Sequence, residues 1–296
     1  MNSLPLSWSL INSEFTNSRI ISNKRIKWFA LQDLNANDFD YRILTETEEN
    51  KQIVIRGCNI DLTNSLNKIG YSAFQFGMEA ILDTSKNHFE KKSLKKLIKR
   101  GLRHGKIKKL FYSQENAKQL EEFRKTASHG NEPQLNNLFQ TEFNPNNELY
   151  AFVDQNDNWL GIILTSRNST EKIHTELILR KANAPIGIME ALVKYTFEDV
   201  KNERYKYLSL GEVPFIKYNK PVDLKSYIAY KVGLLLNFAY NYRGLYYFKN
   251  KFQPQWNELF ICTSSKIKIN HILFLLYNSN FHKLVFYKTF SRLKFY

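Results

Sequence analysis

An aromatic and cationic stretch from Tyr242 to Trp256 holds the side chains with the most evident chemical potential in this chain. It contains no acidic residue, and Lys249 and Lys251 lie two positions apart on a predicted short helix. Lysines so placed bind phosphate groups of a nucleic acid or a lipid, or they form an ordinary solvated face. Tyr242, Tyr246 and Tyr247 could stack on a terminal adenine, although aromatic residues at helical spacing more often pack into a core. The stretch therefore predicts a substrate-binding element with an anionic partner.

A second cationic segment spans residues 91–109 and holds ten Lys or Arg residues with no carboxylate. Leu94, Leu97, Ile98 and Leu102 recur at helical spacing, which predicts a helix with one apolar face and cations elsewhere. A solvated basic face is the alternative, but the self-repulsion of so many cations favours an anionic partner. We predict that this helix follows an RNA backbone or anionic lipid through Lys92, Lys95, Lys96, Lys99, Arg100 and Arg103.

The elements that would position these side chains alternate between strands and helices. β-like runs predict strands at 26–31, 52–56, within 71–83, and at 149–153, 159–166, 173–179, 207–210 and 259–263. Helical patterns cover 115–128, 184–202 and 244–252. The order in the second half is that of the GNAT acyltransferase fold, in which two parallel strands splay apart and open a cleft.

Two carboxylates fall on or just beyond the strands that would flank this cleft. Glu176 lies in the strand at 173–179, and Glu212 follows the strand at 207–210. We predict that both are catalytic, against the alternatives of a surface glutamate or a structural ion pair. The expected architecture is α/β, with two GNAT-like lobes of mixed sheet flanked by helices. These lobes would span residues 1–130 and 131–262, and a basic extension would cover 263–296.

Composition narrows the possible classes of function. The 296 residues are 43% hydrophobic, which is enough for a core, and the net charge of +15 favours an anionic partner. The two cysteines, Cys58 and Cys262, form no disulfide framework and fit a reducing cytoplasm. The six scattered histidines predict no metal site. There is no P-loop or GxGxxG motif, and residues 100–105 do not have the spacing of an acetyl-CoA loop.

Three motifs resemble the C-terminal catalytic domain of phosphatidylglycerol lysyltransferases, also called multiple peptide resistance factors. Residues 176–187 read ELILRKANAPIG and residues 208–214 read LSLGEVP. The third motif follows the family's G-L-x-x-F-K-x-K-F-x-P-x-W with Gly244, Leu245, Phe248, Lys249, Lys251, Phe252, Pro254 and Trp256. The chain departs from the family pattern at three positions, where Glu176 replaces Asp, Leu179 replaces Arg and Ile186 replaces Asn. The resemblance therefore does not specify which amino acid is transferred.

The resemblance implies transfer of an aminoacyl group from aminoacyl-tRNA to phosphatidylglycerol or a similar hydroxyl acceptor. Aminoacyl-tRNA would be the co-substrate, and no cofactor would be needed. Glu176 would then hold the cationic amino group of the aminoacyl moiety. Arg180, beside the position of the family's Arg, would join Lys249, Lys251, Tyr242 and Tyr246 in substrate binding.

Two other functions are consistent with the residues: an acyl-CoA-dependent GNAT N-acyltransferase, and a non-catalytic module that binds RNA or an anionic membrane. The last 38 residues contain no Asp or Glu, and they predict either an interfacial amphipathic segment or a helical cap packed on the second lobe. No apolar run approaches the ~20 residues of a bilayer span, and the N-terminus lacks signal-peptide character. We expect a cytoplasmic protein that associates peripherally with the inner face of the membrane.

Overall fold

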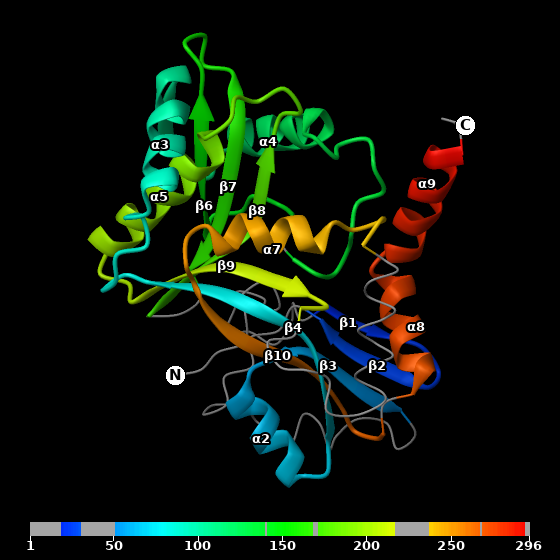
Figure 1. The fold of residues 1–296 in the computed structure, drawn as a ribbon. Helices are drawn as coiled ribbons and strands as arrows, with labels where there is room; N and C mark the ends of the chain where they lie inside the picture. Colours follow the sequence, from blue (N-terminus) through cyan, green and yellow to red (C-terminus); the bar gives the residue numbers. More distant parts are fainter. Residues whose placement is uncertain are drawn as a thin grey trace.

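The computed structural model describes residues 19–30, 51–139, 141–167, 171–216, 237–266 and 268–293. Within these residues one mixed sheet has the order β1-β2-β3-β10-β4-β9-β8-β7-β6-β5 (Figure 1). Its strands are β1 (Arg19–Ser22), β2 (Ile26–Ala30), β3 (Gln52–Cys58), β4 (Ser72–Asp83), β5 (Lys106–Leu110), β6 (Asn147–Val153), β7 (Trp159–Arg167), β8 (Lys172–Arg180), β9 (Tyr207–Pro214) and β10 (Gln255–Thr263). The helices are α2 (Ile60–Lys68), α3 (Lys92–Gly101), α4 (Gln114–Thr126), α5 (Ile188–Asn202), α7 (Tyr242–Asn250), α8 (Ile269–Asn278) and α9 (Phe281–Leu293).

The α/β class is confirmed, as is every strand predicted from the sequence. The sheet continues across the boundary placed at 130/131, because β5 pairs with β6. The last strand, β10, lies between β3 and β4, so the chain returns after α7 to strands from its first part. The division into two lobes stays a prediction; the hydrogen-bonded sheet joins both parts.

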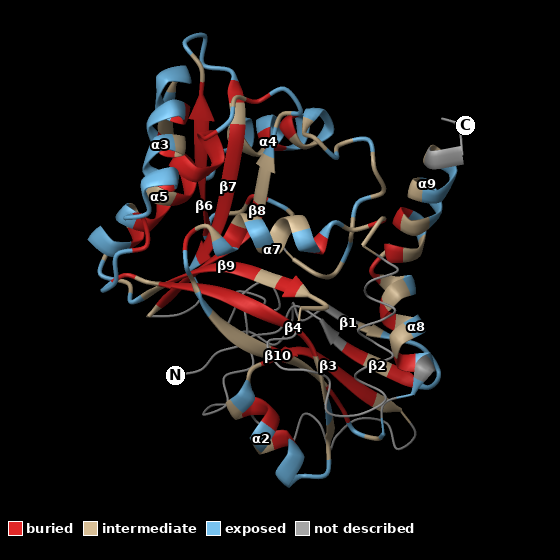
Figure 2. Cartoon of the chain, viewed as in Figure 1, coloured by how far each residue is buried: buried red, intermediate tan, exposed pale blue. Residues whose placement is uncertain are grey.

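The main core fills the space between the sheet and the helix pair α3 and α5. Leu94 and Ile98 of α3 pack with Ile188 and Leu192 of α5 over buried residues of the central strands. Figure 2 shows buried residues concentrated in those strands and exposed residues along the outer side of α3. The two helices can approach closely because Gly101 has no side chain: a Cβ at this position would lie only 2.3 Å from the carbonyl oxygen of Gly187. This contact fixes the beginning of α5.

The segment at 91–109 is not one continuous basic helix. It forms α3 and a short 3-10 turn, and then residues 106–110 form β5 at the sheet edge. The change occurs at Gly105, where a Cβ would lie 1.9 Å from the carbonyl oxygen of Val153. The backbone of β6 lies so close to Gly105 that the helical segment ends there. Residues 106–110 then pair with β6 at the edge of the sheet, although their lysines continue the helical pattern.

The C-terminal extension forms two helices, α8 and α9, beside β1 and β2 (Figure 1). Leu275 and Phe274 of α8 pack with Ile26, Trp28 and Val54 of the sheet. Of the two structures predicted for this tail, the packed helical cap is present, although it lies on strands from the first part of the chain. None of the helices in the described ranges has the length and apolar character needed to cross a bilayer.

Candidate functional site

The parallel strands β8 and β9 separate at the centre of the sheet. They pair at Lys172–Tyr207, Ile173–Leu208 and His174–Ser209. Beyond that point β8 continues beside β7, and β9 continues beside β4. This confirms that the two strands predicted to flank a splay do so, and helix α7 packs against β9 beside it (Figure 1).

Lys249 reaches this splay from the last turn of α7. The helix is capped by Asn241, whose side chain accepts a hydrogen bond from the Gly244 N–H at 2.9 Å. The Lys249 side chain is buried, and its Nζ donates to the carbonyl oxygen of Glu212 at 2.9 Å. A Cβ at Gly211 would lie 3.6 Å from Lys249 Nζ and 3.8 Å from His174 Nε2. These are ordinary contact distances, so the backbone is what favours glycine at Gly211, whose φ is +79°.

The protonation of Lys249 is shifted by its surroundings. Burial lowers its pKa from 10.5 to about 7, and the nearby carboxylates Glu212 and Glu79 offset only part of that effect. Burial disfavours the charged form of an amine because water no longer solvates it. Near neutral pH, Lys249 can therefore both accept and donate a proton.

Glu212 pairs with a residue from a distant part of the sequence, Arg56 of β3. Burial raises the pKa of Glu212, although Arg56, Lys249 and His174 act in the opposite direction. Burial also lowers the pKa of Arg56 to about 10, and its guanidinium lies 4.6 Å from the centre of the Phe76 ring. Within the described residues, Glu212 Oε2 is buried without a hydrogen-bond partner. One carboxylate oxygen thus remains available for a substrate group.

A second buried carboxylate, Glu79 of β4, lies close to polar side chains from β8 and β9. Its Oε1 accepts a hydrogen bond from Ser209 Oγ at 2.6 Å and lies 3.4 Å from Lys172 Nζ and 3.6 Å from His174 Nδ1. Burial opposes its ionisation, but Lys172, His174 and Ser209 outweigh burial and lower its pKa to about 2. Among the described residues, neither ring nitrogen of His174 has a hydrogen-bond partner.

Glu176, the other predicted catalytic carboxylate, is buried two residues beyond His174 on β8. Its Oε1 accepts a hydrogen bond from Ser166 Oγ at 2.7 Å, and Ser166 is the register partner of His174 on β7. Arg180 lies at the end of the same strand, where it is exposed. Its role in substrate binding stays a prediction.

The remaining predicted side chains on α7 have packing partners. Lys251 Nζ lies 2.7 Å from Glu190 Oε1 and thereby ties α7 to α5. Tyr242 is buried edge-on to Phe215, with ring centres 5.7 Å apart. Tyr246 stacks on Trp256 at 5.0 Å. Tyr247, the third tyrosine predicted to stack on a base, is exposed.

The predicted phosphate-binding cations of α3 all lie on its outer side. The exposed residues are Lys92, Lys95, Lys96, Lys99 and Arg100, with Arg103 following in the 3-10 turn. Lys95 Nζ pairs with Glu90 at 2.5 Å, an exposed pair that adds little to stability. The face therefore remains cationic.

Five residues of the site were missed by sequence reasoning: Arg56, Glu79, Lys172, His174 and Ser209. Four of them interrupt a run of residues typical of a buried strand, as in QIVIRGC for Arg56 and KIHTELILR for His174, and Lys172 begins the second of these strands. Charged residues are seldom fully buried without a partner. Polar residues inside apolar strand patterns were thus the available signal.

A separate cluster of three carboxylates, Glu148, Asp199 and Glu203, has oxygens within 4.8 Å of one another. Lys109 Nζ lies 3.0, 2.7 and 2.6 Å from the three, respectively. Burial opposes the charge of Lys109, but the three carboxylates outweigh it and raise its pKa. The lysine occupies the position that a cation would take, so this cluster serves as a structural network.

The chain is similar to known proteins in sequence pattern and in fold. Residues 38–263 match the family model described as "Phosphatidylglycerol lysyltransferase, C-terminal". L-PGS from Bacillus licheniformis has a TM-score of 0.71 and 16% identity, over 88% of this chain and 84% of that chain. The C-terminal domain of a putative lysylphosphatidylglycerol synthetase from Agrobacterium fabrum has a TM-score of 0.66 and 18% identity, over 83% and 80%. FemX has a TM-score of 0.53 and 11% identity, over 82% of each chain.

At these identities the solved structures show a shared fold. No curated protein sequence matches the chain. The family model, however, covers most of the sequence, including β3 to β10 and every residue of the splayed site. The chain therefore belongs to the family of phosphatidylglycerol lysyltransferase C-terminal domains, and it is a lysylphosphatidylglycerol synthase-like transferase.

Proposed function

We propose that this protein transfers an aminoacyl group from aminoacyl-tRNA to the hydroxyl of phosphatidylglycerol or a closely similar lipid. The observation that carries the proposal is Lys249, a buried amine between diverging parallel strands with a pKa of about 7. An aminoacyl ester is already activated, so the enzyme has to align the two substrates and move one proton.

The reaction needs a proton acceptor for the lipid hydroxyl and a proton donor for the leaving ribose oxygen. In the proposed mechanism, neutral Lys249 accepts the proton as the hydroxyl oxygen attacks the ester carbonyl. The resulting ammonium then donates a proton to the ribose oxygen when the ester bond breaks. Lys249 thus returns to its starting state, and the hydrogen bond to the Glu212 carbonyl orients its Nζ.

Buried carboxylates are suited to the cationic amino group of the aminoacyl moiety. Glu212 Oε2 is buried without a partner among the described residues, and Glu176 lies on the facing strand. We assign the amino group to these two carboxylates, because a charge-assisted hydrogen bond fixes both position and charge. The exposed cations of α3 supply the phosphate contacts that a tRNA donor requires.

The acyl-CoA alternative has less support from the same residues. A pyrophosphate binds well at a free helix N-terminus, and α5 is the helix that follows β8. The first turn of α5 contains Glu190, which is buried and paired with Lys251. The preceding Gly187 packs against α3, where a Cβ would lie 2.1 Å from the carbonyl oxygen of Leu97. A negative charge and close packing leave this terminus poorly suited to a pyrophosphate.

A transfer assay tests the proposal. The protein is mixed with tRNA charged with a pool of labelled amino acids and with phosphatidylglycerol vesicles, and label in the lipid is counted. We expect labelled lipid with the wild type, a loss of at least 100-fold with Lys249→Met, and little change with Arg243→Gln. Arg243 is an exposed cation on the same helix, so it controls for charge. Equal labelling by Lys249→Met and the wild type would refute the assigned role.

A further inference from the structure

The helices α8 and α9 lie beyond the part of the chain that matches the family model, which ends at residue 263. The pair is fixed to the rest of the protein. The Asn136 N–H donates to the Ser279 carbonyl at 3.1 Å, and Asn137 Nδ2 donates to the Asn278 carbonyl at 3.0 Å. Lys288 Nζ pairs with Glu132 at 2.5 Å. The two helices therefore present a defined outer surface.

That outer surface is apolar and largely aromatic. We call it the α8–α9 apolar face, and it comprises Leu273, Tyr277, Phe286, Tyr287 and Phe290, which are 55, 67, 62, 39 and 60% exposed. The spacing places Leu273 with Tyr277 on one side of α8, and the other three on one side of α9. The Tyr277 ring stacks on His282 at 4.8 Å, which joins the two helix surfaces. Exposed apolar surface of this kind marks an interaction site.

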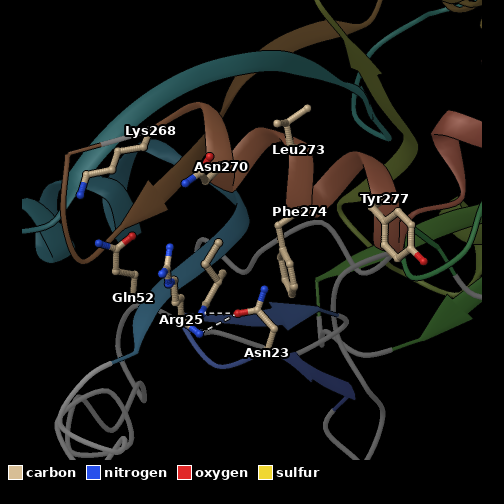
Figure 3. Close-up of a pocket in the computed structure, with 9 residues that line it drawn as sticks. Asn23, Arg25, Gln52, Lys268, Asn270, Leu273, Phe274 and Tyr277 are labelled. Atoms are coloured by element: carbon tan, nitrogen blue, oxygen red, sulfur yellow. Dashed lines mark hydrogen bonds between the residues drawn. The ribbon is translucent and has the colours of Figure 1, made fainter.

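Apart from Glu132, which pairs with Lys288, the charged residues named around this face are cations. No Asp or Glu follows Glu258 in the sequence, and Lys268 and Lys283 are exposed. A pocket of about 620 Å³ opens at the base of α8, between that helix and the β1–β2 turn (Figure 3). Its nine described lining residues include the cations Arg25 and Lys268 and no carboxylate. Leu273 and Tyr277 line the pocket and also belong to the apolar face.

We propose that the α8–α9 apolar face docks on the surface of an anionic phospholipid bilayer, with a lipid headgroup phosphate in the pocket at Arg25 and Lys268. Aromatic side chains insert at the interface between headgroups and acyl chains, and nearby lysines are attracted to anionic lipid. An RNA would use the cations but not the apolar side chains. A second copy of the chain would cover the apolar side chains but leave the cations facing each other.

The inference rests on the proposed function in one respect, because a lipid acceptor gives the enzyme a reason to reside at a bilayer. It goes further by assigning docking to a surface outside the family match. Docking would hold the protein where its acceptor is concentrated, while the chemistry takes place at the splay of β8 and β9.

The test measures binding of the full chain to sedimented vesicles of phosphatidylcholine with and without phosphatidylglycerol. We expect Phe286→Ser/Phe290→Ser to lower the partition coefficient at least tenfold. Phe111→Ser is the matched control, since Phe111 is a 66% exposed aromatic far from α8 in sequence, and it should bind like the wild type. Arg25→Gln/Lys268→Gln should weaken binding only to vesicles that contain phosphatidylglycerol. Each variant changes exposed side chains, and its melting temperature confirms folding.

Three outcomes would overturn docking by this face: unchanged binding of Phe286→Ser/Phe290→Ser, an equal loss with Phe111→Ser, or a wild-type dimer that this double variant dissociates. Transfer to a short-chain, monomeric phosphatidylglycerol separates the two proposals. Docking variants should retain that transfer and lose transfer to vesicles. If the wild type transfers to neither lipid but still needs the apolar face for vesicle binding, only the proposed reaction fails.

Discussion

Glu79 and Glu212 are direct register partners on the neighbouring strands β4 and β9. Two buried carboxylates side by side repel each other. Here each carboxylate has a cation nearby that offsets this repulsion. Arg56 pairs with Glu212, and Lys172 lies near Glu79. Both carboxylates raise the pKa of Lys249. The amine therefore lies within a buried network in which two carboxylates are each matched by a cation.

The pH dependence of the reaction should follow the ionisation of Lys249. Because the neutral amine is the proposed proton acceptor, kcat/KM should rise with pH up to about 7 and then level off. The charge of Glu212 raises the pKa of Lys249. Glu212→Gln should therefore shift the rising part of the pH profile to lower pH, whatever its effect on the maximum rate. Initial rates between about pH 5 and 9 would show both. A rising part that keeps its position in Glu212→Gln would contradict the assignment.

Removal of the Glu79 carboxylate should destabilise the fold. Glu79→Gln leaves Lys172 buried without its counter-charge, and breaking such a pair costs about 3–5 kcal/mol. The pKa of Glu79 is lowered from 4.5 to about 2, so its stabilisation is complete above pH 4.5 and is lost as pH falls toward 2. Urea unfolding at neutral and at acid pH measures both effects.

The control for that experiment is Glu90→Gln, which removes an exposed partner of Lys95 and should change stability by less than about 0.5 kcal/mol. Equal stability of Glu79→Gln and Glu90→Gln at neutral pH would show that the buried network contributes nothing.

The cluster around Lys109 should become a cation site only when the lysine is removed. EDTA should leave the melting temperature of the wild type unchanged. Lys109→Met leaves Arg167, which lies 2.5 Å from both Glu148 and Glu203, to balance three carboxylates. We expect this loss to cost about 1–3 kcal/mol after allowance for solvent screening. Added Ca²⁺ or Mn²⁺ should restore part of that stability, because carboxylate oxygens bind hard cations.

Lys108→Met serves as the comparison, since Lys108 pairs with the exposed Asp157 at 2.8 Å. This variant should show no rescue by metal. A wild-type melting temperature that falls with EDTA would contradict the structural role of Lys109.

The outer side of α3 should provide salt-dependent affinity for tRNA. Lys92→Gln/Lys96→Gln/Lys99→Gln should reduce the slope of log K against log[salt] by roughly 0.7–0.9 for each phosphate that the variant no longer neutralises. Lys118→Gln/Lys125→Gln removes exposed cations of α4 and should leave the slope unchanged. Filter binding with bulk tRNA across several salt concentrations is the measurement, and equal slopes for the two variants would exclude α3 as the RNA surface.

The sequence by itself determined most of the strands and helices, the parallel pair that splays, and the family motifs, but it did not indicate β1, α2 or β5. The elements that it did indicate depend on local patterns: short runs of apolar, β-forming residues predict β7 and β8, and apolar residues at helical spacing predict α3 and α5. The sequence also singled out Lys249, as a substrate-binding cation in the third motif, and Glu212, because it lies just beyond a predicted strand.

Only the tertiary structure decided which distant residues meet. Arg56 lies 156 positions from Glu212, and Glu79 lies 130 positions from Ser209, yet each pair is in contact. No local pattern encodes such pairing, because it depends on β4, β9 and β10 becoming neighbours in one sheet. Burial follows from the same packing, and burial is what lowers the pKa of Lys249. The chemical character of the site is therefore a property of the folded sheet.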